Sequence, residues 1–223
     1  MTSIKQPMFV AVAAFTLSLL AVHSGLLAQD GRSNEHWVGT WTTAEVGRPQ
    51  TPPVAPQAPP AQGQNAASAP AAPAPFLHFN NQTLRQIVHT SIGGTRARVV
   101  LSNRFGTAPL TIGAAHMAVR SKDAAIVPSS DRRLTFSGRP TITIPSGATV
   151  YSNPVDLTVP PLADIAIDLY VPGDTNTSSP LTMHNGALQT NYVSETGNHV
   201  GMASLPVRFK CRPEITIFEL RPA

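Results

Sequence analysis

The dominant pattern in this chain is an alternation of apolar and polar residues that begins near Phe76. Successive side chains of a β-strand point to opposite faces, so a period of two indicates strands. Residues 83–92 and 95–103 follow this period, and Gly93-Gly94 lies between them as a tight-turn signal. The sequence therefore predicts a hairpin of two strands. The first strand would place its apolar face on Leu84, Val88 and Ile92, opposite Arg85, His89 and Ser91.

Further short strands are predicted at close intervals along the rest of the chain. Gly, Pro, Ser, Asn and Asp separate them, and no stretch combines a sustained helical period with capping residues. Many short strands at such spacing are typical of a β-sandwich or barrel. We therefore predict an all-β fold, a jelly-roll-like β-sandwich. Its other strands would span residues 37–41, 110–120, 133–136, 140–144, 149–152, 155–159, 164–171 and 187–194.

The first 28 residues have the pattern of a secretory signal peptide. Lys5 supplies a positive start, residues 8–20 are apolar, and small residues follow, so cleavage is expected after Ala28. The apolar run is short for a membrane span and lacks a basic flank, and no Cys follows it that would carry a lipid anchor. We expect an exported protein, periplasmic or secreted, without a stable membrane anchor.

A low-complexity segment covers residues 48–75. It contains nine prolines, and most of its other residues are Ala and Gln. Such a sequence has too little apolar bulk to form a core and favours an extended, disordered insert. The insert would separate a first strand region, 29–47, from the main β-domain, 76–207. Because loop-closure entropy grows slowly with length, strand 37–41 is still expected to join the same sheet.

Charge and cysteine content narrow the function classes. The formal net charge is +4 and the pI about 9.7, but the basic residues are scattered. Arg96, Arg98 and Arg104 form the densest group, and alternating arginines on a strand indicate a solvated face rather than the clustered stripe of a nucleic-acid binder. The single cysteine, Cys211, cannot form an internal disulfide, so the fold must depend on an apolar core.

The loop after strand 164–171 contains Gly173-Asp174-Thr175, one residue type away from the Gly-Asp-Ser of many secreted esterases. A Thr nucleophile needs an N-terminal amine or a placed base, and an Asp in a turn usually binds nearby backbone amides. No Gly-x-Ser-x-Gly elbow and no His-x-x-x-His pair occurs in the chain. We interpret this motif as a turn, and we expect no catalytic, cofactor-binding or metal-binding residue.

Four residues remain as candidates for contact with a ligand or a neighbouring domain. His184 and Asn185 lie in a polar loop before a strand, where a surface or turn-stabilising role is the alternative. Trp37 and Trp41 would form a sugar-stacking platform if exposed, although Trp on a strand is more often part of the core.

Four segments, in the same order along the chain, resemble one protein family. The segments are WVGTWTTA (37–44), NQTLRQIVHTSIGGTRARVVLSNRFGTAPLTIGAAHMA (81–118), DRRLTFSGRPTITIPSGATVYSNPVDLTVPPLADIAIDLYVPG (131–173) and HNGALQTNYVSETGNHVG (184–201). They are similar to the N-terminal region of bacterial secreted GDSL/SGNH-type hydrolases, in the branch grouped with xylan-associated arylesterases and acylhydrolases. The resemblance extends from about Trp37 to Val207, apart from the insert.

This resemblance implies an all-β accessory domain. In the family, a flavodoxin-like catalytic domain follows it, with a Ser nucleophile in a Gly-Asp-Ser block, Gly and Asn oxyanion donors, and an Asp-x-x-His near the end. None of these blocks occurs here, so no catalytic residue is carried over. After Val207 the sequence departs from the family pattern. We expect residues 208–223 to be an aberrant tail, produced by a frameshift near Val207, that is disordered or adds an adventitious edge strand.

The resulting expectation is the N-terminal, non-catalytic β-domain of an exported SGNH/GDSL-type ester hydrolase, truncated before its Ser nucleophile domain. The chain alone would be inactive, its partner would be the missing catalytic domain, and the substrate an ester or a polysaccharide. The alternative is a free-standing extracellular carbohydrate-binding module, which exposure of Trp37, Trp41 or Tyr192 would favour. A third hypothesis is an unrecognised enzyme that pairs His184 with Asp164 or Asp168.

Overall fold

The structure, a computed structural model, describes residues 36–42, 44–48, 78–175, 181–184, 188–211 and 216–221. The predicted signal peptide and all of the Pro-rich insert except Arg48 lie outside these residues. The described strands belong to one compact unit that starts at Trp37. Within them the helical content is confined to 3₁₀ residues, namely the turn Pro128–Ser130 and Thr175, so the predicted all-β class is confirmed. No helix in this part of the chain is long and apolar enough to cross a membrane.

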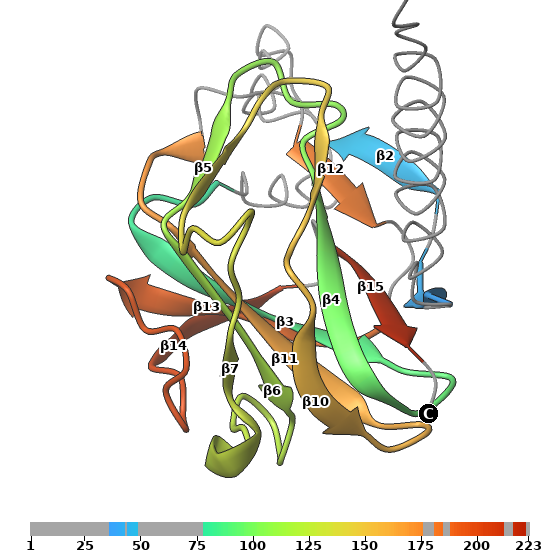
Figure 1. Cartoon of the computed structure of the whole chain (residues 1–223). Helices are drawn as coiled ribbons and strands as arrows, with labels where there is room; N and C mark the ends of the chain where they lie inside the picture. Colours follow the sequence, from blue (N-terminus) through green and yellow to red (C-terminus); the bar gives the residue numbers. More distant parts are fainter. Residues whose placement is uncertain are drawn as a thin grey trace, which may run out of the picture. The chain divides into compact units, whose positions relative to one another are not determined.

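Two antiparallel sheets make up the fold, with two short ribbons beside them (Figure 1). The five-stranded sheet contains, in spatial order, β1 (Val38–Trp41), β15 (Thr216–Arg221), β4 (Gly94–Ser102) and β10 (Val155–Val159), and β9 (Thr149–Tyr151) also pairs with β4. The six-stranded sheet contains β14 (Val207–Cys211), β13 (Asn191–Thr196), β3 (Gln82–His89), β11 (Asp164–Val171), β6 (Ala114–Val119) and β7 (Arg132–Arg133). The ribbons are β2 (Glu45–Arg48) with β12 (Leu181–His184), and β5 (Leu110–Ile112) with β8 (Ile142–Ile144).

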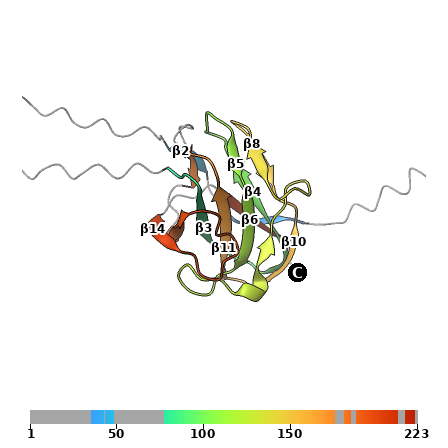
Figure 2. The same cartoon turned by 90° about the vertical axis from the view of Figure 1, so that its left-hand side faces the viewer.

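The main hydrophobic core lies between the two sheets, as in a β-sandwich (Figure 2). Alternate residues of β3 and β11 face it from the six-stranded sheet, and alternate residues of β4 face it from the other sheet. The fully or nearly fully buried side chains include Leu84, Val88, Ala97, Val99, Leu101, Met117, Ile165, Ile167 and Leu169. The period-two pattern of the sequence therefore identifies the core-facing positions of the central strands.

The predicted hairpin between residues 83–92 and 95–103 is wrong. β3 pairs with β11 and β13, whereas β4 pairs with β15, β10 and β9, so the chain changes sheets between His89 and Gly94. The N–H of Thr90 donates to the carbonyl of Ala163 at 2.8 Å. A Cβ at Gly93 would lie 2.9 Å from the Val159 carbonyl oxygen, so glycine is needed for this close backbone approach. The Gly-Gly signal marks a sandwich corner, not a two-residue turn.

The single strand predicted over residues 110–120 is divided in two. β5 pairs with β8, and β6 pairs with β11 and β7. The break falls at Gly113, whose N–H donates to the Tyr170 carbonyl at 2.9 Å. A Cβ at this position would lie 2.8 Å from the Tyr170 ring. The glycine lets the backbone pass beside that ring and change its partner strand.

The C-terminal segment is part of both sheets. β14 forms an edge of the six-stranded sheet by pairing with β13. β15 does not lie at an edge as expected, because it pairs with β1 on one side and with β4 on the other. Six residue pairs join β15 to β4, from Thr216 opposite Leu101 to Arg221 opposite Arg96. Without β15, β1 would have no hydrogen-bonded neighbour among the described strands of its sheet.

A second layer covers the outer face of the six-stranded sheet. Residues 120–131 and 197–206 lie over it and join each other where the N–H of Ile126 donates to the Ala203 carbonyl at 2.9 Å. Beneath them is a smaller apolar cluster that includes Ile87, Ala166 and Leu205. The polar face of β3 that carries Arg85 is therefore covered, and seven of the eight residues of β3 are buried.

Candidate functional site

The two tryptophans expected as a possible platform have different environments. Trp41 is only 9% exposed and belongs to the main core. Trp37 is half-buried, and the Arg98 guanidinium lies 4.4 Å from the centre of its ring. Tyr192, the third aromatic of that hypothesis, is 2% exposed. A stacking surface made of Trp37, Trp41 and Tyr192 is therefore excluded by the fold.

Arg98 instead connects two aromatic rings on the outer face of the five-stranded sheet. Its guanidinium also lies 4.8 Å from the centre of the Tyr151 ring, and Tyr151 is 53% exposed. Cation–π contacts of this kind are worth about 0.5–1 kcal/mol at exposed sites. The arrangement fixes the Trp37 indole against the sheet, and it leaves Tyr151 as the accessible aromatic of the group.

The predicted contact residues His184 and Asn185 lie at the end of β12 (Leu181–His184) and just beyond it. His184 is the last residue of β12 and lies opposite Glu45 of β2 in the ribbon. Its side chain and the whole of Asn185 lie outside the described residues. The proposed partners of His184 are both engaged elsewhere: Asp164 binds His89 and Arg120, and Asp168 binds Arg85.

The Gly173-Asp174-Thr175 segment holds a loop in place. Thr175 is 5% exposed, and its N–H donates to the Phe79 carbonyl at 2.9 Å. In return, the N–H of Phe79 donates to the Thr175 Oγ1, also at 2.9 Å. This reciprocal pair fastens the loop after β11 to the residues just before β3. A hydroxyl that is buried and accepts a backbone N–H in this way is a structural group.

Asp164 lies between two basic side chains at one end of the six-stranded sheet. The His89 Nδ1 lies 2.8 Å from its Oδ1, and the Arg120 guanidinium donates to its Oδ2 at 2.7 Å. Partial burial acts to raise the pKa of this carboxyl, but the hydrogen bonds from His89 and Arg120 and their charges outweigh burial and hold the pKa below its ordinary value. Asp164 is therefore an ionised anchor for the end of the sheet.

Arg85 and Asp168 form a buried ion pair under the covering layer. The guanidinium donates two hydrogen bonds of 2.6 Å to the two carboxylate oxygens, and the side chains are 0% and 4% exposed. Arg85 also donates to the carbonyls of Ala124 and Met202, one from each covering segment. The pair therefore ties both segments to the sheet, and its charges and donors are used within the fold.

His116 and Asp131 form a second pair beside it. The His116 Nδ1 lies 2.8 Å from the Asp131 Oδ2, and both side chains are mostly buried. Gly201 passes over them with a φ of +73°, and a Cβ there would lie 2.8 Å from the His116 ring. The N–H of Gly201 donates to Asp168 at 2.9 Å. The covering segment therefore closes over this pair and Asp168.

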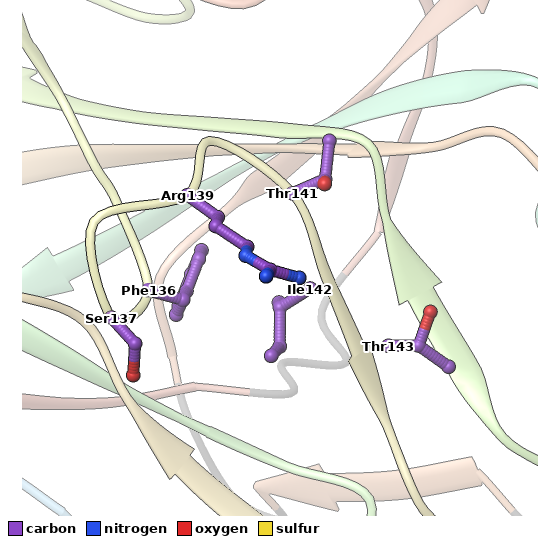
Figure 3. Close-up of a pocket in the computed structure, with 6 residues that line it drawn as sticks. All are labelled: Phe136, Ser137, Arg139, Thr141, Ile142 and Thr143. Carbon is purple, nitrogen blue, oxygen red and sulfur yellow. The ribbon is translucent and has the colours of Figure 1, made fainter.

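An open pocket of about 550 Å³ lies beside β8 (Figure 3). Its floor includes Phe136, which is buried, and Ile142, which is half-buried. Four exposed side chains complete the lining: Ser137, Arg139, Thr141 and Thr143. The Arg139 side chain extends from the turn toward Ile142, so its guanidinium lies among the other lining residues. The pocket thus combines apolar carbon, hydroxyl groups and one cation.

The turn that carries Arg139 is closely defined. Phe136 and Arg139 exchange two backbone hydrogen bonds, of 2.7 and 3.0 Å, around Ser137 and Gly138. Both central residues have positive φ, +49° and +80°, as a type I′ turn requires. Asn153 supports the turn, because its Oδ1 accepts the N–H of Gly138 at 2.9 Å. Arg139 is therefore presented by a rigid hairpin.

Within the described residues, no group of three or more His, Cys, Asp or Glu side chains is placed to hold a metal ion. No protein-family model matches the chain, and no curated protein matches its sequence significantly.

The pocket was missed at the level of sequence. Ser137-Gly138 between predicted strands is a recognisable hairpin signal, but nothing in it distinguishes a turn that lines a pocket from any other turn. All the lining residues belong to one short segment, 136–143, and the sequence does not show that their side chains surround a hollow.

Proposed function

We propose that this chain is the non-catalytic β-sandwich domain of an exported SGNH/GDSL-type ester hydrolase. The observation that carries the non-catalytic part is the environment of Thr175. Its hydroxyl is 96 residues away in sequence from the backbone N–H it accepts, and it is buried in that contact. The resemblance of residues 37–207 to the family supports the rest.

The engagement of the acidic side chains also favours a non-catalytic role. Asp131, Asp164 and Asp168 each bind a basic side chain that belongs to the framework of the sandwich. A general base or a nucleophile needs a group that can exchange protons with a substrate. In the described part of the chain these pairs instead hold strands and covering segments together.

The coding DNA beyond the codon for Ala203 tests the family assignment. Reading all three frames should reveal a Gly-Asp-Ser block followed by an Asp-x-x-His block, and restoring that frame should give an active esterase. The assignment fails if no frame contains these blocks. β14 and β15 are integral to the two sheets, which favours a domain junction after Arg221 over one near Val207.

The second candidate is a free-standing extracellular carbohydrate-binding module. The open pocket beside β8 favours it, because the pocket combines an apolar floor with several hydroxyl groups. Binding of oligosaccharides by a chain whose gene has no catalytic block in any frame would select the second candidate.

A further inference from the structure

We propose that the pocket beside β8 binds an acidic sugar unit, with the guanidinium of Arg139 receiving the sugar carboxylate. This inference adds a ligand class to the binding role proposed above, and it rests on that role only in placing the domain where polysaccharide is present. It starts from a cation in the pocket that the described part of the fold does not use.

Arg139 differs from the arginines that build the framework. Arg85 and Arg120 make short hydrogen bonds to carboxylates within the domain. In the residues that the structure describes, the Arg139 guanidinium has no hydrogen bond, ion pair or ring contact, and only its backbone is engaged, with Phe136. The guanidinium is therefore available, and its planar fork matches a carboxylate in a bidentate arrangement.

The rest of the lining matches a sugar better than a simple anion. Ser137, Thr141 and Thr143 present hydroxyl groups, which both donate and accept hydrogen bonds as sugar hydroxyls do. Thr143 contacts Thr111 through their Oγ1 atoms at 3.0 Å, which fixes its position and leaves further capacity for hydrogen bonds. Phe136 and Ile142 supply apolar carbon for the C–H face of a ring.

Size and preorganisation agree with this ligand. A volume of about 550 Å³ lies within the range of about 300–1,000 Å³ typical of small-molecule sites. The type I′ turn and its support by Asn153 hold the backbone of Ser137 and Arg139 in place before a ligand arrives, which lowers the backbone part of the entropic cost of binding. The exposure of four lining residues leaves the pocket open enough for one unit of a longer chain.

Calorimetric titration of the full chain with trigalacturonate tests the proposal. Three comparisons define the result: the methyl ester of trigalacturonate, which has the same shape without the charges; the Arg139→Gln variant; and the Arg208→Gln variant. Arg208 is an exposed residue of β14, at one edge of the six-stranded sheet. The pocket segment follows β7, which is the opposite edge, so replacing Arg208 removes the same charge at another place on the domain.

The expected result is binding of trigalacturonate by the wild-type chain and by Arg208→Gln. Binding should be weaker by about tenfold or more with Arg139→Gln and with the methyl ester, as loss of a charge-assisted hydrogen bond implies. Arg139→Lys, which keeps the charge but loses the fork, should give an intermediate affinity.

Three results would overturn the proposal: no binding by the folded wild-type chain, equal affinity for Arg139→Gln, or an equal loss in Arg208→Gln, which would indicate a general effect of net charge. Because Arg139 is exposed and makes no side-chain contact in the described structure, its replacement should leave the melting temperature unchanged, and the same samples check this. The Gly-Asp-Ser test on the coding DNA is independent of these titrations.

Discussion

Replacing Asp168 by Asn should lower the free energy of unfolding by about 3–5 kcal/mol, the range measured when one partner of a buried ion pair is removed. The Arg85 side chain is fully buried, and two of its hydrogen bonds, each of 2.6 Å, end on this carboxylate. Asparagine keeps the volume but removes the charge. The buried guanidinium then lacks its opposite charge, and the Gly201 N–H no longer donates to a carboxylate.

The double variant Arg85→Met, Asp168→Leu removes both charges. It therefore separates the free-energy cost of an unpaired buried charge from the net contribution of the ion pair to stability. Removing both charges eliminates the desolvation penalty, so the double variant should be more stable than either single variant. It should still be less stable than the wild-type chain, because the carbonyls of Ala124 and Met202 lose the donors that Arg85 supplies.

Urea unfolding followed by circular dichroism gives the free energies. Asp156→Asn is the matched control: Asp156 also binds an arginine, Arg96, at 3.3 Å, but its side chain is 93% exposed, so the change should stay within about 1 kcal/mol of wild type. The reasoning is refuted if Asp168→Asn costs no more than this control, or if the double variant is as unstable as the sum of its two single variants.

Three further predictions concern other parts of the sandwich. Because the pKa of Asp164 is lower in the folded chain than its ordinary value, its stabilising effect is present at neutral pH and is lost as pH falls through the folded pKa. When pH is lowered from about 6 to about 3, the melting temperature of Asp164→Asn should therefore fall less than that of the wild-type chain. An equal fall in the two proteins would contradict this. Gly93→Ala should cost about 1–3 kcal/mol in urea unfolding, since its Cβ would lie 2.9 Å from a backbone oxygen. Gly173→Ala, with open space around its Cβ, should stay within about 0.5 kcal/mol, and similar losses for the two would refute the argument. Arg98→Ala should increase acrylamide quenching of Trp37 fluorescence, whereas equal quenching would show that the guanidinium does not shield the indole.

The sequence contained enough information for the fold class and for several strands. Residues 155–159 and 164–171 were predicted as strands, and they form β10 and β11 with the same bounds. Alternation works there because one face packs on the main core and Pro or Gly residues end the pattern. It reports which face a residue occupies, and not which strand lies beside it.

The errors have that same physical origin. The Gly93-Gly94 signal is local, but β3 and β4 are separated because the chain turns a corner between the sheets. Arg85 follows the pattern of a solvated residue, and only the distant segments at Ala124 and Met202 bury it. The C-terminal strand β15 was not expected inside a sheet, because its pairing with β1 and β4 joins segments far apart in the sequence.

The candidate site was less accessible to sequence reasoning. Trp41 was considered both as a ligand contact and as core, and the structure places it in the core. Arg139 gave no signal, since a single arginine after a turn is common, and its importance comes from the hydroxyls and apolar carbon that β8 brings beside it. The lining residues lie within residues 136–143, but the alternation of apolar and polar residues there does not show that their side chains surround a hollow.

The central proposal is that Gly173-Asp174-Thr175 is a structural loop and that this domain does not hydrolyse esters by itself. Release of p-nitrophenol from p-nitrophenyl acetate by the purified chain tests this most directly, with Thr175→Val alongside. We expect both proteins to match the buffer rate, while Thr175→Val unfolds at lower urea because the Phe79 N–H loses its acceptor. Turnover by the wild-type chain that the folded Thr175→Val variant lacks would contradict the account and assign a catalytic role to Thr175.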